Sequence, residues 1–264
     1  MADPEQPSAP ERAISLDGLS ICLVGINYAP DSTGIAPYNV AMARAFADAG
    51  ADVHVVTGVP HYPQWVTHPD YTRGSRWDEV IDGIRVTRVG HHVPANPGLL
   101  GRGRMEASFL ANATRVVRAD TSDIVIAVTP SLAGLAAGVY GKRGRPFGVL
   151  VQDLTGNAAG ESGSTGGTAS RAIASAEYRW LRTAQRVGII TPQFGSVLVE
   201  HGIRPEALVD LPNFTHITPV DVTIKQARAH LGWPASATRE HSSYREGRSE
   251  GEDPGRSGGR SAMR

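Results

Sequence analysis

The fold is decided by a stretch near the N-terminus, LSICLVGINYAPDSTGI at residues 19–35, together with the alanine-rich segment that follows it. Residues 19–26 form a nearly unbroken apolar run, which is typical of a parallel strand covered on both faces. Residues 35–49 carry apolar side chains at helical spacing, with Pro37 in the first turn and Gly50 as a stop signal. A second apolar run at 52–57 completes a predicted strand–loop–helix–strand unit.

Strand and helix patterns continue to alternate, which predicts an α/β fold with a doubly wound, mainly parallel Rossmann-like sheet. Further strands are expected at 80–89, with a hairpin at Asp82-Gly83, and at 123–128, 146–151, 186–191 and 207–211. Further helices are expected after a Gly/Pro loop at 91–104, and at 132–140, 169–185, 194–201 and 222–231. Ligands of such sheets bind at the carboxyl ends of the strands, so the loop at 27–34 is the first candidate for a site.

Composition excludes several classes of protein. Lys+Arg and Asp+Glu both total 26, so no net field favours nucleic acid. No apolar run is long enough to cross a membrane, and residues 1–12 lack the apolar core of a secretion signal, so a cytoplasmic location is expected. A nicotinamide-dependent oxidoreductase is disfavoured because the first loop lacks G-x-G-x-x-G and no acidic residue ends the second strand.

Three regions follow from the distribution of apolar residues. Residues 1–17 are expected to be a disordered leader, residues 18–234 the folded domain, and residues 235–264 a disordered tail rich in Arg, Glu, Gly and Ser. The single cysteine, Cys22, lies inside the first strand and is expected to be buried. A Gly/Ser/Thr tract at 156–168 is expected to be mobile or ordered by a ligand.

Several polar residues have both a functional and a structural interpretation. Asp153 follows a buried strand and suits either proton transfer and hydroxyl binding or a loop-bracing hydrogen bond. Asp31 has the same two interpretations, with helix capping favoured. The arginines at 102, 104, 115 and 118 suit lipid headgroups or a phosphate-bearing acceptor, or simply a solvated helix face. The loop histidines at 61, 68, 91 and 92 show no zinc-ligand spacing, so no metal site is expected.

The combination of four motifs resembles the N-terminal half of family 4 glycosyltransferases, in the colanic-acid type that builds exopolysaccharides. These motifs are GINYAP with TGI at 25–35, PHYPQW at 60–65, VQD at 151–153 and LPN at 211–213. The resemblance covers residues 19–234. It implies a GT-B architecture and retaining transfer of a hexosyl group from a nucleotide-sugar to a glycan or lipid-linked acceptor, without a metal or other cofactor. It also implies a possible peripheral contact with the inner face of the membrane.

The resemblance assigns roles residue by residue. Gly34 matches a glycine near the donor phosphates, and Gln152 or Asp153 falls where many relatives place a catalytic-region histidine. Gln152 and Asp153 are the expected catalytic residues. The expected substrate-binding residues come from the first loop, the PHYPQW loop and the basic run after it: Asn27, Tyr28, Gly34, His61, Tyr62, Trp65, Arg102 and Arg104.

The family's donor-binding half is not matched in this sequence. No Glu-x₇-Glu element follows a strand–helix pattern, and no second α/β domain is predicted. A truncation or frameshift near 235–239 is the corresponding hypothesis, and the chain alone is expected to be an inactive acceptor-side domain. The alternative from another class is a non-catalytic module that binds a glycan, a membrane or a partner.

Overall fold

The computed structural model describes residues 15–154, 167–213 and 222–234. The chain divides into two compact units, one at Met1–His216 and a second at Ile217–Arg264. The described part of the second unit contains the helix α7 (Ile224–His230), which begins with a capping box between Thr223 and Gln226. Most of the two ends expected to be disordered, and of the tract at 156–168, lies outside the described residues.

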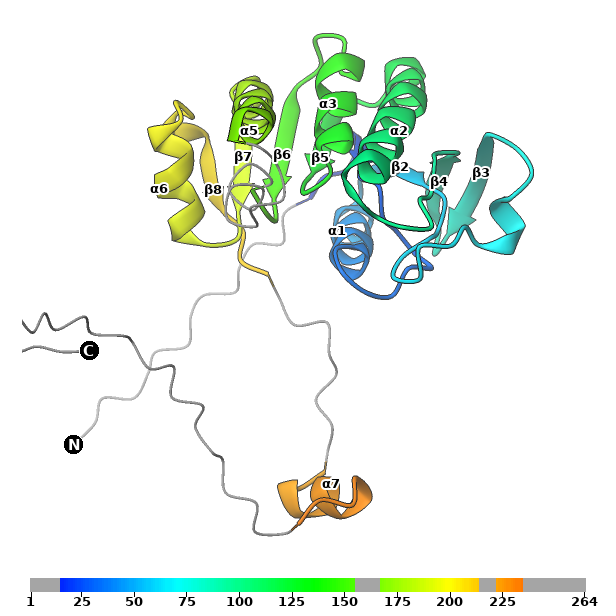
Figure 1. The fold of residues 1–264 in the computed structure, drawn as a ribbon. Coiled ribbons are helices and arrows are strands. Elements are labelled where there is room, and N and C mark those ends of the chain that lie inside the picture. The colour runs from blue at the N-terminus through cyan, green and yellow to red at the C-terminus, as the bar shows by residue number, and fades with distance from the viewer. Residues whose placement is uncertain (1–14, 155–166, 214–221, 235–264) are drawn as a thin grey trace, which may run out of the picture. The chain divides into compact units, whose positions relative to one another are not determined.

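The larger unit is built on a sheet whose eight described strands run in the order β3-β4-β2-β1-β5-β6-β7-β8 (Figure 1). Their bounds are β1 (Ser20–Val24), β2 (Asp52–Gly58), β3 (Arg76–Ile81), β4 (Ile84–Val89), β5 (Ile124–Val128), β6 (Phe147–Val151), β7 (Arg186–Ile189) and β8 (Leu208–Asp210). All neighbouring strands are parallel except the β3–β4 hairpin. From β1 the chain winds outward through β2 and β4, returns to β5, and then winds outward the other way. The predicted doubly wound, mainly parallel fold is confirmed.

Helices cover both faces of this sheet. The described helices of the unit are α1 (Ala36–Asp48), α2 (Leu99–Ala119), α3 (Leu132–Gly141), α5 (Gly167–Leu181) and α6 (Pro192–Glu200), with 3₁₀ turns η1 (Pro69–Tyr71) and η2 (Pro205–Ala207). Leu23 of β1 packs in the core on the α1 side, whereas Cys22 and Val24 pack in the core shared with α2, α3 and α5. This two-sided burial explains why β1 reads as an unbroken apolar run. Among the helices in the described ranges, none combines the length and the apolar character that a bilayer span requires.

The helix α2 begins earlier than the sequence predicted. A Gly/Pro loop was expected through Arg104, but the helix starts at Leu99, with Gly98 as its extended N-cap. A Cβ at Gly101 would lie 2.7 Å from the Cβ of Pro94, so glycine lets the preceding loop pack directly on the helix. Glycine inside a helix costs about 1 kcal/mol, and here tertiary packing overrides that preference. Arg102 and Arg104 therefore lie on a helix and not in a loop.

A buried arginine connects several segments around β4. The Arg88 side chain has no exposed surface, and its Nε donates to Glu79 Oε1 of β3 at 2.9 Å. Its other nitrogens donate to the carbonyl oxygen of Gly58 at 3.3 Å and to that of Ala29. The guanidinium also lies 5.2 Å from the centre of the Tyr71 ring. One side chain thus links β3, the end of β2, the loop after β1 and η1.

Replacing Arg88 with Met should lower the free energy of unfolding by about 3–5 kcal/mol, because a partly buried carboxylate and two carbonyls lose their donor. The matched control is Arg85→Met on the same strand, because Arg85 makes an exposed ion pair with Asp52. That control should cost about 1 kcal/mol at most. Urea unfolding of the two variants measures the difference, and equal losses would contradict the role given to Arg88.

Candidate functional site

An open groove of about 390 Å³ lies at the carboxyl ends of β1 and β2. Its walls come from two loops, residues 26–35 after β1 and residues 59–75 after β2. Asp31 and Ser32 line it from the first loop, and His61, Tyr62 and Gln64 line it from the second. The groove thus occupies the edge of the sheet where doubly wound proteins bind ligands.

The two walls meet at Gly34. Its φ is +63°, a conformation that side chains with a Cβ rarely adopt. A Cβ at this position would also lie 3.3 Å from Cε1 of the Tyr62 ring. Glycine is therefore required both by the backbone and by the packing of the aromatic ring on the first loop.

Aromatic side chains lie in and behind the second wall, where His61 and Tyr62 line the groove and Trp65, which does not line it, packs behind them. The Trp65 ring lies in edge-to-face contact with Tyr62 at 6.1 Å and with His61 at 5.8 Å between ring centres. The Arg102 guanidinium lies 5.5 Å from the centre of the Trp65 ring, which joins the start of α2 to this loop. Tyr62 is 36% exposed, so part of this aromatic surface faces solvent next to polar groups of the groove.

Hydrogen bonds within the first loop and from α1 hold the conformation of this loop. Asn27 Nδ2 donates to Asp31 Oδ2 at 3.1 Å, and Asn39 of α1 donates to the Asn27 carbonyl at 2.8 Å. The prediction that Asp31 caps α1 is wrong, because the N-cap is Ile35 and no side chain caps the helix. The Tyr28 side chain is 2% exposed and packs in the core, where burial raises its pKa. The Tyr28 side chain therefore anchors the first loop to the hydrophobic core.

The predicted catalytic pair lies at the end of β6. Thr129 Oγ1, at the end of β5, accepts from the Gln152 N–H and donates to the Asp153 carbonyl, each at 3.0 Å. Asp153 Oδ1 accepts from the Leu154 N–H at 2.8 Å, which is the loop-bracing contact that the sequence left open as an alternative. Gln152 exchanges two side-chain hydrogen bonds with Asn213, at 2.9 and 2.8 Å.

The two predicted parts of the site share one edge of the sheet but are not adjacent. The strand β5 lies between β1 and β6, and neither Gln152 nor Asp153 lines the groove. Thr129, directly after β5, lies between the groove and the Gln152–Asp153 pair. Sequence reasoning missed this residue, because a threonine before a proline carries no distinctive signal.

Two exposed arginines, Arg102 and Arg104, lie in the first two turns of α2. Arg102 Nε donates to the Pro97 carbonyl at 2.9 Å, and the Arg104 side chain is exposed. One turn later, Glu106 Oε2 accepts from the Ala133 N–H at 2.6 Å and from Ser131 Oγ at 3.1 Å. Burial raises the pKa of Glu106 despite these hydrogen bonds. Glu106 therefore anchors the start of α2 to the start of α3, a role that the sequence did not suggest.

Two histidines pack behind the aromatic wall. His61 Nδ1 donates to the Val59 carbonyl at 2.9 Å, and His91 Nδ1 donates to the His92 carbonyl at 3.1 Å. Their rings are 4.8 Å apart, and His91 Nε2 is buried without a hydrogen-bond partner in the structure as described. Burial, and then the neighbouring His61, lower the pKa of His91 to about 4. His91 is therefore neutral at pH 7 and has a structural role.

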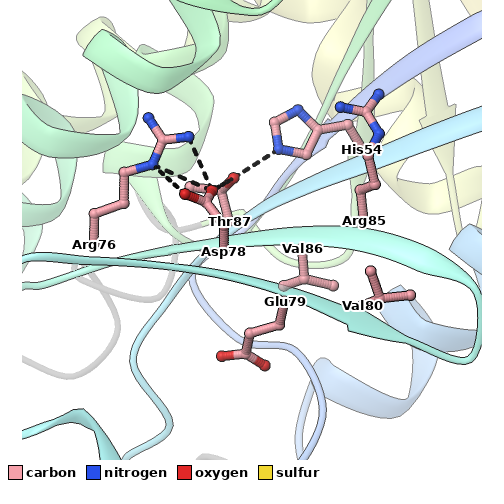
Figure 2. Close-up of a pocket in the computed structure, with 8 residues that line it drawn as sticks. All are labelled: His54, Arg76, Asp78, Glu79, Val80, Arg85, Val86 and Thr87. Carbon is pink, nitrogen blue, oxygen red and sulfur yellow. Dashed lines mark hydrogen bonds and ion pairs between the residues drawn. The ribbon is translucent and has the colours of Figure 1, made fainter.

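A second groove, of about 330 Å³, lies on the sheet surface formed by β2, β3 and β4 (Figure 2). His54 lies between Asp120, with Nδ1 2.7 Å from Oδ2, and Thr87, with Nε2 2.9 Å from Oγ1. This arrangement resembles a hydroxyl–imidazole–carboxylate triad. However, Thr87 donates its only hydroxyl proton to Asp78 Oδ1 at 2.6 Å, so His54 Nε2 must donate to Thr87. His54 is therefore not a base for Thr87, and we place the functional site at the first groove.

The chain belongs to the family described as the glycosyl transferase 4-like domain, which matches residues 33–213. This match contains Gly34, the PHYPQW loop, α2 and the ends of β5 and β6.

A curated relative is consistent with this family. Over 222 residues the chain is 29% identical to WcaI of Escherichia coli (strain K12), a protein assigned as a colanic acid biosynthesis glycosyl transferase. The match covers 77% of this chain and 54% of WcaI, so the chain spans about half the length of this relative.

Solved structures show weaker likenesses. A protein of Listeria monocytogenes assigned as a UDP-N-acetylglucosamine 2-epimerase matches with a TM-score of 0.44 and 14% identity, over 72% of this chain and 44% of that one. The UDP-GlcNAc 2-epimerase of Methanocaldococcus jannaschii matches with a TM-score of 0.39 and 14% identity, over 73% of this chain and 44% of that one. Both scores are below 0.5, so the fold assignment rests on the sheet itself.

The neutral state of His91 predicts a pH dependence of stability. Its pKa is about 4 in the folded chain and about 6.5 when unfolded, so the unfolded chain binds more protons between these values. The contribution of neutral His91 to the free energy of unfolding is therefore complete above pH 6.5. As the pH falls to about 4, this contribution is lost, which lowers the free energy of unfolding by roughly 3 kcal/mol. Urea unfolding at pH 7 and pH 4 should show this extra loss in the wild type but not in His91→Gln. The control is His92→Gln, an exposed neighbour that should behave like the wild type. Parallel pH profiles for all three proteins would contradict the assignment.

Proposed function

We propose that this chain is the acceptor-side domain of a retaining glycosyltransferase, which transfers a hexosyl group from a nucleotide-sugar to a glycan or lipid-linked acceptor in exopolysaccharide synthesis. The observation that carries the proposal is the lining of the groove at the ends of β1 and β2. That lining holds hydroxyl, amide, imidazole and carboxylate groups beside an aromatic ring, and it contains no lysine or arginine. Such a surface suits a neutral sugar, whereas a nucleotide diphosphate needs cationic or N–H donors.

The proposed acceptor contacts follow from the positions of the side chains. Tyr62 provides a partly exposed ring against which the apolar face of a sugar packs. Asp31, Ser32 and Gln64 stand around it and can pair with sugar hydroxyls. Gln152 and Asp153 lie along the same edge, beyond β5, and we assign them to the side of the site that faces the donor. This assignment requires no metal ion.

We also propose that the chain alone does not transfer sugar. Catalysis needs groups that stabilise charge on the departing phosphates, and the groove lining offers none that is cationic. A transfer assay with the purified chain, UDP-glucose and a membrane lipid extract should therefore give no turnover. Reproducible turnover that disappears in Asp153→Ala would contradict this part of the proposal.

The alternative is a non-catalytic module that binds a glycan or a partner. A UDP-glucose titration followed by NMR separates the two functions. The transferase domain should show saturable shifts of the Gln152 and Asp153 amides, because we assign both residues to the side of the site that faces the donor. A pure binding module should show none.

Changing Tyr62 to Ala should weaken sugar binding about threefold to tenfold, because the stacking surface is removed. Saturation-transfer NMR with disaccharides of glucose, galactose and N-acetylglucosamine measures the effect. The control is Tyr140→Ala, which removes another exposed tyrosine, near the end of α3. The acceptor assignment fails if no sugar receives saturation, or if Tyr62→Ala binds as well as the wild type.

We further propose that α2 rests on an anionic membrane surface, which would bring a lipid-linked acceptor to the groove. Leu99 and Leu100 are 60% and 84% exposed at its start. The side chains of Arg102, Arg104, Arg115 and Arg118 are exposed along the same helix, whose sole acidic residue, Glu106, is engaged with α3. Apolar side chains beside arginines suit the headgroup region of a bilayer.

The double change Arg104→Gln with Arg115→Gln should weaken binding to phosphatidylglycerol vesicles by about 25-fold, since each arginine near such a surface contributes about 1 kcal/mol. Co-sedimentation measures the binding, and added salt should weaken it. Arg143→Gln is the control, because Arg143 is exposed outside α2. Binding that is absent in the wild type, or is lost equally in the control, would contradict the membrane contact.

A further inference from the structure

Three potential metal ligands meet inside the sheet, away from the groove. They are Cys22 on β1, His54 on β2 and Asp120 at the C-cap of α2, and their ligand atoms all lie within 4.8 Å of one another. Cys22 and His54 are register partners across β1 and β2. His54 is the third residue of β2, so the cluster lies toward the amino end of that strand, whereas the groove lies at the carboxyl end.

Two side chains of this cluster face one carboxylate. His54 Nδ1 lies 2.7 Å from Asp120 Oδ2, and the Cys22 sulfur lies within 4.8 Å of the ligand atoms of both residues. The other oxygen, Oδ1, is held by Arg145 Nη1 at 2.9 Å and by the Ser122 N–H at 3.0 Å. Because Oδ1 has these two donors, Oδ2 remains turned toward the thiol and the imidazole.

We propose that Cys22, His54 and Asp120 form a binding site for a zinc-like divalent cation. Thiolate, imidazole and carboxylate are the three ligand types that Zn²⁺ takes in proteins. Metal entry would require the Cys22 thiol to lose its proton to solvent and the lone pair of His54 Nδ1 to be free for the cation. A thiolate, a neutral imidazole, a carboxylate and Zn²⁺ sum to zero charge, so the loaded site would bury no uncompensated charge.

The groups around the cluster suit this site. His54 Nε2 donates to Thr87 Oγ1, which in turn donates to Asp78, as Figure 2 shows. A histidine that binds a metal usually donates its other ring N–H in this way, which orients the ring. Arg145 orients the carboxylate while leaving Oδ2 toward the cluster. His54 also lines the open groove of Figure 2.

The site would have a structural role. It joins β1, β2 and the junction between α2 and β5, and none of its three ligands lines the groove assigned to the acceptor. Its existence is therefore independent of the proposed transfer of sugar, and it does not conflict with a transfer reaction that uses no metal.

Cobalt substitution tests the site directly on the tag-free, metal-stripped full chain. One equivalent of Co²⁺ should produce a thiolate-to-cobalt charge-transfer band, and an equal amount of Zn²⁺ should remove it. Cys22 is the only cysteine in the sequence, so this band assigns the sulfur ligand without a variant. His54→Gln should bind at least about tenfold more weakly, whereas His230→Gln, an exposed histidine of α7, should bind as the wild type does.

Thermal unfolding provides a second readout. Zn²⁺ at a hundred times its dissociation constant should raise the melting temperature of the wild type by about 5–10 °C, and should leave Cys22→Ala unchanged. The proposal is overturned if the wild type shows no charge-transfer band with Co²⁺. It is also overturned if His54→Gln binds Zn²⁺ with wild-type affinity, or if Zn²⁺ stabilises Cys22→Ala as much as the wild type.

Discussion

The arrangement of the two loops at the carboxyl ends of β1 and β2 depends on the hydrogen bonds of the buried Arg88 guanidinium. It donates to Gly58 at the end of β2, to Ala29 in the first loop and to Glu79 of β3, while Tyr71 of η1 lies beside it. These partners belong to both walls of the groove and to the hairpin beside it. A lysine at this position would offer one compact charge in place of a planar set of five donors, so it could not satisfy the same oxygens together.

The chemistry of the groove follows from this scaffold. Because a single side chain holds both loops, the Tyr62 ring can pack on Gly34, where no Cβ intervenes. Helix α2 packs next to these loops. Its Arg102 lies over the Trp65 ring, and its Glu106 accepts a hydrogen bond from the start of α3. A groove without lysine or arginine, beside a basic helix, suits a sugar acceptor carried on an anionic lipid, which is the arrangement that we propose.

Much of the fold could be predicted from local sequence patterns. The apolar run of β1, the turn at Asp82-Gly83 and the stop at Gly50 each reflect a preference of a few neighbouring residues, and the structure confirms all three. The start of α2 was mispredicted, because Gly101 and Gly103 disfavour a helix locally and only packing against Pro94 accounts for one of them. His61 and Tyr62 of the PHYPQW loop, which the sequence predicted to bind substrate, line the groove beside the first loop.

The remaining features depend on contacts between residues far apart in the chain. Arg88 looks like an ordinary polar position in a strand, yet its partners lie 9 to 59 positions away. The partnership of His54 with Asp120 spans 66 positions, and that of Gln152 with Asn213 spans 61. No local period or spacing encodes such pairs, so they became visible only when the sheet order was known.

Hydrogen exchange of Arg88→Lys, measured by mass spectrometry, tests the central claim that one side chain holds both walls of the groove. The account predicts that amides in the two loops, residues 26–35 and 59–75, exchange faster together, while those of β5 and β6 keep their wild-type rates. Faster exchange confined to the β3–β4 hairpin, or unchanged exchange in both loops, would contradict it.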